Sequence, residues 1–214
     1  MEYFSIRDIK QTQIIQKKSK FIATLIPVEN TTDIEEKLQE IRKKHHDARH
    51  NCYAYRILEN NKIVERASDD GEPSGTAGAP LLEQLRGYNM VNCIIIVTRY
   101  FGGILLGTGG LVKAYSQVAC NVLKMSENVK LIKVVLLQLT INYSELEKLK
   151  YYLKTINGEI EKIDYKNDIE LIIKIPYNGN EKFTNNYSNF PFLFKNCKKI
   201  EERNGYISTK NDKT

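Results

Sequence analysis

Apolar residues along the first half of the chain gather into short runs that predict strands. Residues 19–28 predict a first strand, and residues 51–58 and 62–67 predict a hairpin that turns at 59–61. Residues 91–101, "VNCIIIVTRYF", are apolar almost throughout, which is typical of a strand buried on both faces. This half of the chain therefore predicts a sheet.

Three further segments repeat apolar residues at intervals of three and four, which predicts helices. The first covers residues 31–45, where Thr32 stands three residues before Glu35 in the spacing of a capping box. The second starts at Pro80 and stops at Gly87. The third follows a glycine-rich loop and carries an apolar stripe on one face, formed by Leu111, Tyr115, Val118, Val122 and Met125.

The pattern changes at residues 125–130, "MSENVK", which predict a linker. Beyond it the chain predicts the order β-α-β-β-α-β, with strands at 132–142, 159–165, 169–176 and near 195–203, and helices at 143–157 and about 180–188. That order is the ferredoxin-like arrangement. We therefore predict an α+β protein of two domains, residues 1–128 and 129–214.

Composition and cysteine spacing agree with a folded intracellular protein. Hydrophobic residues make up 42% of the 214 positions and charged residues 27%. The four cysteines, at 52, 93, 120 and 197, are too widely spaced for a disulfide framework or a paired metal motif. No signal peptide opens the chain, and the longest apolar run is too short to cross a bilayer. We expect a soluble, cytoplasmic protein that does not contact membranes.

The net charge of +6 is spread evenly along the chain. Residues 1–130 carry 18 Lys and Arg against 15 Asp and Glu, and residues 131–214 carry 14 against 11, so each part is +3. This weak basicity is compatible with contact to RNA or the ribosome. No recognition element for a DNA sequence is expected.

Two polar, glycine-rich loops are the main candidates for function: "SDDGEPSGTAGAP" at 68–80 and "RYFGGILLGTGGLVKAY" at 99–115. The second is not a Walker phosphate loop, and Val112 occupies the third glycine position of a dinucleotide fingerprint. What remains is a strand that ends at Arg99, a glycine turn, and a helix that begins near Gly110. Its N–H groups suit a phosphate or carboxylate, but the glycines also suit a tight crossover alone.

The three histidines of the chain lie within six residues, "HHDARH". His50 and Cys52 share one side of a strand, as a nucleophile and its base or half of a metal site would. We favour the simpler interpretation, in which His50 hydrogen-bonds a loop and Cys52 packs in the core. The acids of the first loop suit a hard cation, but turn capping is the commoner role of such runs. No metal or cofactor is expected.

Three long motifs in order, "DARHNCYAY", "SDDGEPSGTAGAP" and "RYFGGILLGTGGLVKAY", resemble the YigZ/IMPACT family over residues 19–125. Residues 130–203 resemble the smaller C-terminal domain of its bacterial members. The resemblance implies a first domain like the second domain of a small-subunit ribosomal protein. It also implies a ferredoxin-like second domain, similar to one in elongation factor G, and a role around translation or its regulation. Eukaryotic relatives regulate a starvation-sensing kinase and carry an extra RWD domain, for which this chain has no room, so that role is not carried over.

The family motif gives the candidate ligand-binding residues, although no established reaction comes with it. His46 departs from the proline expected at its position. We expect the two loops and the histidine strand to meet at one surface. The candidates are His45, Arg49, His50, Asp69, Asp70, Glu72, Ser74, Thr76, Arg99, Gly102, Gly103, Gly107, Gly109, Gly110 and Lys113.

Three functions fit these residues. The first is a translation-associated binding protein that touches the ribosome, RNA or a ribosome-bound partner, with Arg49, Arg99 and Lys113 neutralising phosphates. The second is a hydrolase for a nucleotide or peptide-like ligand, with His50 as base and an acid of the first loop, such as Asp69, Asp70 or Glu72, as partner. The third is a sensor of a small anion. The hydrolase ranks second because no nucleophile is evident, so we expect binding rather than catalysis.

Overall fold

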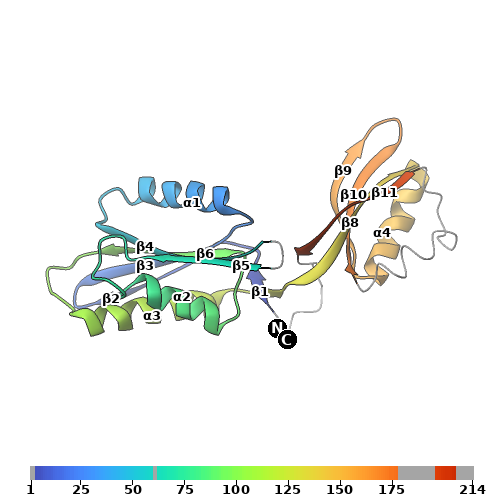
Figure 1. Cartoon of the computed structure of the whole chain (residues 1–214). Helices are drawn as coiled ribbons and strands as arrows, with labels where there is room; N and C mark the ends of the chain where they lie inside the picture. Colours follow the sequence, from blue (N-terminus) through green and yellow to red (C-terminus); the bar gives the residue numbers. More distant parts are fainter. Residues whose placement is uncertain (1–2, 60–61, 178–195, 206–214) are drawn as a thin grey trace. The chain divides into compact units, whose positions relative to one another are not determined.

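The computed structural model describes residues 3–59, 62–177 and 196–205. Contacts between Cα atoms divide the chain into two compact units, residues 1–130 (unit 1) and residues 131–214 (unit 2) (Figure 1). Both units combine helices with an antiparallel sheet, so the chain is an α+β protein of two domains. In the described ranges no helix is both long and apolar enough to cross a membrane.

Unit 1 is built on a five-stranded sheet in the order β2-β3-β6-β4-β5, with every neighbouring pair antiparallel. β6 lies at the centre, and each of its residues from Cys93 to Arg99 is buried. This confirms the strand predicted from the apolar run. The strands are β2 (Lys10–Gln16), β3 (Ser19–Pro27), β4 (His50–Glu59), β5 (Lys62–Ser68) and β6 (Cys93–Tyr100).

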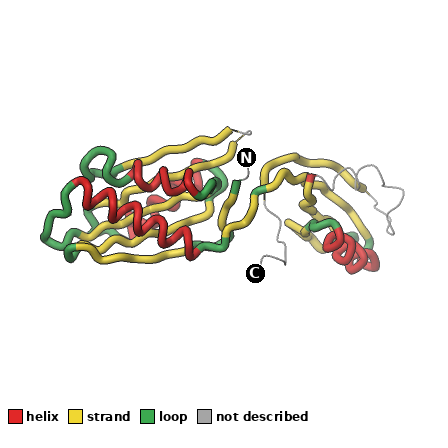
Figure 2. The backbone as a smooth tube through the Cα atoms, turned by 90° about the horizontal axis from the view of Figure 1, so that it is seen from below, coloured by secondary structure: helices red, strands yellow, loops and turns green. Residues whose placement is uncertain are grey.

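Helices cover both faces of this sheet. α1 (Thr31–Lys44) lies on one face, and α2 (Gly78–Gly87) and α3 (Thr108–Met125) lie on the other, as Figure 2 shows from their side. Alternate residues of β6 serve the two layers, since successive side chains of a strand point to opposite faces. Ile94 and Ile96 pack in the cluster under α1, whereas Ile95 and Val97 pack under α2 and α3.

The start of α1 differs from the sequence prediction. Asn30 is the N-cap residue, and its Oδ1 accepts a hydrogen bond from the Asp33 backbone N–H at 2.9 Å. Asp33 in turn accepts from the N–H of Glu29 at 2.9 Å. Asn30 and Asp33 thus cap this helix two residues earlier than the predicted Thr32–Glu35 pair, which was wrong, and Asp33 accepts from the residue before the N-cap rather than from the N-cap itself.

The predicted linker at 125–130 was also wrong. β7 (Asn128–Lys130) pairs antiparallel with β1 (Phe4–Ile6), a strand that the sequence did not predict, and Val129 is buried. Met125 was predicted to end the apolar stripe of α3, but it is 56% exposed because the helix ends there and the stripe closes at Val122. Unit 1 thus extends through the segment that was predicted to be a linker.

Unit 2 is a four-stranded antiparallel sheet in the order β11-β8-β10-β9. α4 (Leu146–Thr155), preceded by the short helix η1 (Tyr143–Glu145), packs on one face of it. The predicted helix at about 180–188 lies outside the described residues. The strands are β8 (Ile132–Ile141), β9 (Glu159–Tyr165), β10 (Ile169–Pro176) and β11 (Asn196–Gly205).

Candidate functional site

The predicted motifs meet at one end of the unit 1 sheet, where β6 ends and β4 begins. His50 stands opposite Arg99 in the register of these two strands. The loop 69–77 contacts the last turn of α1 through an ion pair between Arg42 and Asp70, at 3.0 Å. The loop 101–107 is tied to the β2–β3 turn, because the Gly102 N–H donates to the Ser19 hydroxyl at 3.1 Å. We call this region the motif end of unit 1.

A buried ion pair lies beneath the surface of the motif end. Arg99 Nη1 is 2.6 Å from Glu72 Oε1, and the two side chains are only 6% and 3% exposed. The Tyr115 hydroxyl, from α3, donates to the same carboxylate oxygen at 2.9 Å. Arg99 and Glu72 therefore join β6 to the loop 69–77 and are closed to an external ligand. Arg99, which was predicted to neutralise a phosphate, is thus paired with Glu72 in the structure, and the Glu72 carboxylate has little surface open to a cation.

Cys52 belongs to the same buried network. Its thiol donates to the Asp69 carbonyl oxygen at 2.9 Å and lies 3.2 Å from the Tyr115 hydroxyl. Burial raises the pKa of the Cys52 thiol to about 12. Burial also raises the pKa of Tyr115, with the neighbouring thiol and carboxylate adding to the effect. A thiol that is protonated and enclosed packs in the core rather than acting as a nucleophile.

The Asp69 carboxylate accepts hydrogen bonds from backbone N–H groups of its own loop. Oδ2 accepts from the Gly75 N–H at 2.8 Å, and Oδ1 accepts from the N–H groups of Ala77 and Gly78 at 2.9 and 2.8 Å. Partial burial opposes ionisation, yet these three bonds hold the pKa of Asp69 below its usual value. The carboxylate thus organises the turn and the start of α2. Within the described residues no cluster of His, Cys, Asp and Glu suits a metal ion.

His50 and Asp70 hold the loop against β4. The His50 ring places Nδ1 2.9 Å from the Asp70 carbonyl oxygen, and the Asp70 carboxylate accepts from the Asn51 N–H at 2.7 Å. The favoured interpretation of His50, as a residue that positions a loop, fits this geometry. Of the other candidates in this loop, Thr76 is buried and donates to the Pro73 carbonyl, whereas Ser74 is exposed.

His45 lies at the end of α1, beside the last residue of β6. Its Nδ1 is 2.9 Å from the Tyr100 hydroxyl, which donates to Asp47 at 3.1 Å. The other ring nitrogen, Nε2, is buried without a hydrogen-bond partner among the described residues. Partial burial, with the nearby charges of Lys44 and Lys20, lowers the pKa of His45.

The three glycines in the loop 101–107 occupy positions where a side chain would clash or would be strained. A Cβ on Gly102 would lie 2.0 Å from the Lys18 carbonyl carbon, so the loop approaches the β2–β3 turn too closely for any side chain. Gly107, with φ of 76°, is the residue before α3, which begins at Thr108, two residues earlier than predicted. Gly109 and Gly110 lie in the first turn of α3, and Gly103 also has positive φ.

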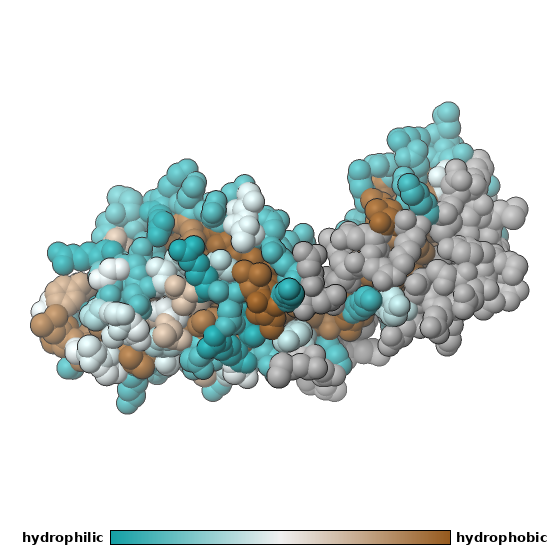
Figure 3. Space-filling model, viewed as in Figure 1, coloured by the Kyte–Doolittle hydropathy of each residue, from teal (hydrophilic) through white to brown (hydrophobic). Residues whose placement is uncertain are grey.

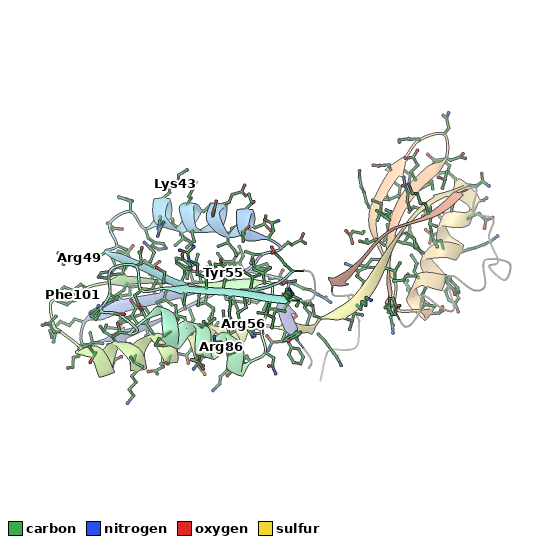
Figure 4. The ribbon with its side chains drawn as sticks, in the orientation of Figure 1. Lys43, Arg49, Tyr55, Arg56, Arg86 and Phe101 are labelled. Carbon is green, nitrogen blue, oxygen red and sulfur yellow. The ribbon has the colours of Figure 1, made fainter. Side chains whose placement is uncertain are left out.

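Most of the positively charged residues at the motif end are not among the candidates predicted from the sequence. Among the described residues, a set of cations there forms no ion pair, and only two of them were predicted. Figure 4 shows Arg49 at the same end of the sheet as Phe101, with Lys43 on α1 nearby. The signal was present in "KKSK" and "RKKHH", which flank strand and helix ends. This set, which we call the basic cluster, is Lys17, Lys18, Lys20, Lys43, Lys44, Arg49 and Lys113.

The fold and these motifs define a two-domain α+β protein whose first domain ends in a motif-rich, basic surface. The Impact N-terminal domain matches residues 17–123, and a domain of unknown function, DUF1949, matches residues 139–186. The chain belongs to the IMPACT family, as a bacterial two-domain member of the YigZ type.

Relatives match over most of the chain. It is 37% identical to the IMPACT family member YvyE of Bacillus subtilis, over 87% of this chain and 83% of that protein. It is 35% identical to the family member YigZ of Escherichia coli, over 75% and 79%. A crystal structure of a hypothetical protein aligns with a TM-score of 0.63 at 30% identity, over 94% of this chain and 98% of that one. The two-domain architecture is therefore shared with a solved structure.

Proposed function

We propose that this chain is a translation-associated binding protein that contacts RNA, most simply ribosomal RNA, through the basic cluster of unit 1. The observation that carries the proposal is that these cations lack ion-pair partners within the described residues, because the neighbouring acids are already engaged. Asp70 pairs with Arg42 and Glu72 pairs with Arg99. The link to translation itself rests on the family resemblance, and we propose a cytoplasmic location on the same ground.

Lysine and arginine side chains at such a surface recognise the phosphate backbone. Each phosphate that they neutralise releases a counterion, so binding weakens steeply as the salt concentration rises. Contacts of this kind position a protein on nucleic acid but carry no sequence information. We therefore propose affinity for RNA without readout of a DNA sequence.

The finer fold types belong to the same proposal. In unit 2 the chain order β8, α4, β9, β10, β11 and the sheet order β11-β8-β10-β9 fit the ferredoxin-like arrangement. We propose this type for unit 2, and for unit 1 the type of the second domain of a small-subunit ribosomal protein. We also keep, as a prediction, that the two domains fold separately.

The alternatives draw less support from the same residues. A hydrolase at the surface of His50, Asp69, Asp70 and Arg99 would need groups that are free to act. Here the Asp69 carboxylate is occupied by backbone N–H groups, and Arg99 is buried in an ion pair. A small-anion site that relies on Arg99 meets the same obstacle. The hydrolase and the anion sensor therefore stay predictions ranked below RNA binding.

Sedimentation with ribosomal fractions tests the proposal. The full chain should cosediment at low salt and be released as salt rises, and K43Q/K44Q/R49Q should cosediment much less at every salt concentration. The control K10Q/K62Q/K124Q removes the same charge from the opposite end of unit 1, where β2 and β5 begin and α3 ends. Equal loss of cosedimentation in both triple variants would show that only the net charge matters. If the wild-type chain did not cosediment at low salt, the proposal would be overturned.

A further inference from the structure

We infer that the loop 101–107, with the neighbouring first turns of α3, is an apolar wedge that inserts among unpaired RNA bases. This inference rests on the proposed function and narrows its ligand from RNA in general to single-stranded segments. Its basis is an apolar surface at the motif end whose side chains are exposed to solvent. We call this surface the apolar tip: Phe101, Ile104, Leu105 and Val112.

The four residues of the apolar tip are apolar, yet each of them is exposed to solvent. Leu105 is 81% exposed, Ile104 43%, Phe101 42% and Val112 38%. Figure 3 shows apolar residues gathered at the end of unit 1 where Figure 1 places this loop. Single exposed apolar residues are ordinary, but several together on one loop indicate a contact surface.

The base of the apolar tip is fixed, which suits a wedge. The guanidinium of the buried Arg99 lies 5.6 Å from the centroid of the Phe101 ring and 5.3 Å from that of Phe21. The next residue, Gly102, is pressed against the backbone of Lys18. Phe101 therefore has a firm support on one side while its exposed surface faces solvent, so little ordering is needed when a base stacks on it.

The charges around the apolar tip select its occupant. Lys17 and Lys18 adjoin it through the contact with Gly102, and Lys113 follows Val112 in α3. A single-stranded RNA segment offers both complements, since each nucleotide brings one phosphate and one flat apolar face. In an A-form duplex the base faces are stacked and out of reach. An acidic protein would need a block of carboxylates to match the same cations.

Fluorescence anisotropy with the full chain tests the inference. The probes are a labelled oligouridine, a blunt RNA duplex of equal phosphate number, a short acidic peptide rich in Glu and Leu, and phosphatidylglycerol vesicles. We expect tighter binding to oligouridine than to the duplex. F101A should weaken oligouridine binding about tenfold, as loss of one stacking contact does, and leave duplex binding unchanged. L105S should also weaken oligouridine binding but not duplex binding, because it replaces an exposed apolar side chain with a polar one. M125S is the matched control, because Met125 is exposed at the far end of α3.

The possible failures are distinguishable. Equal affinity of the wild type for both RNAs, or equal loss of both in F101A, would overturn the wedge while leaving phosphate binding intact. Leu105-dependent binding to the acidic peptide or to vesicles, without preference for oligouridine, would assign the apolar tip to another occupant and overturn the inference. If neither RNA binds, the proposed function itself fails.

Discussion

Removing either partner of the Arg99–Glu72 pair should destabilise unit 1 strongly. Both side chains are almost fully buried, so R99A leaves a carboxylate, and E72A a guanidinium, without its counter-charge. Breaking a buried pair in this way costs about 3–5 kcal/mol. Urea unfolding of each variant measures the loss, and K113A, which removes an exposed charge, is the control.

The double variant R99M/E72L separates charge from packing. Because it removes both buried charges together, it should unfold at a higher urea concentration than either single variant. If R99A unfolded like the wild type, Arg99 would not be part of the scaffold, and its earlier assignment as a phosphate ligand would return.

Asp69 gives the loop a dependence on pH. Its folded-state pKa lies below the unfolded value of about 4, since three backbone N–H groups bind the carboxylate. Its stabilising contribution is therefore fully present above that pH and is lost as the pH falls through the folded pKa. D69N should cost about 2 kcal/mol at pH 7, and the gap to wild type should narrow in acid. Urea unfolding of D69N and of the wild type, at pH 7 and at acidic pH, measures the difference in stability. A difference that did not change with pH would contradict this role of Asp69.

At the scale of elements, two glycines of one motif should respond oppositely to alanine. In G102A the new Cβ would lie 2.2 Å from the Lys18 carbonyl oxygen, so the loop 101–107 must move away from the β2–β3 turn. In G109A the Cβ meets nothing within 4 Å and lies in the first turn of α3. Thermal unfolding should show a clear loss for G102A and a gain of up to about 1 kcal/mol for G109A. Equal effects would contradict the close approach at Gly102.

Elements with strong periodicity were predictable from sequence. The apolar run of β6 and the stripes of the helices follow from their own residues. β2 was missed because "KQTQIIQ" alternates weakly, as an edge strand with one exposed face does. β1 was missed because three residues carry no period, and its pairing with β7 depends on a partner at the far end of unit 1. Such pairings are set by tertiary contacts, which local patterns do not contain.

The candidate site was predictable in place but not in detail. The motifs do meet at one end of the sheet, as expected. From its residue type alone, Arg99 was predicted to bind a ligand. Its partner Glu72 lies in a distant loop of the sequence, so their ion pair becomes visible only in the folded structure. Conversely, Lys43 lies in the last turn of α1, and its position at the same end of unit 1 as Arg49 became visible only when α1 was placed on the sheet.

At the scale of the whole molecule, the position at which the chain is cut between the two units should decide how stable the first unit is by itself. Residues 1–130 should fold alone, since β7 completes unit 1. Residues 1–126 should be less stable by about 2 kcal/mol, because β1 loses its partner and the buried Val129 is gone. Urea unfolding of both fragments, with amide NMR spectra to establish folding, gives the comparison. Equal stability would show that β7 is dispensable.

The pairing of β1 with β7 bears on how the chain is made. In unit 1 the first strand to be synthesised is bonded to the last, and in unit 2 β8 is likewise bonded to β11. The β1–β7 and β8–β11 pairings can therefore form only after the final strand of each unit has left the ribosome, and the β1–β7 pairing can form before any of β8 emerges. We therefore predict that the two units fold in separate steps during synthesis, and that a chain interrupted after residue 130 contains a folded first domain.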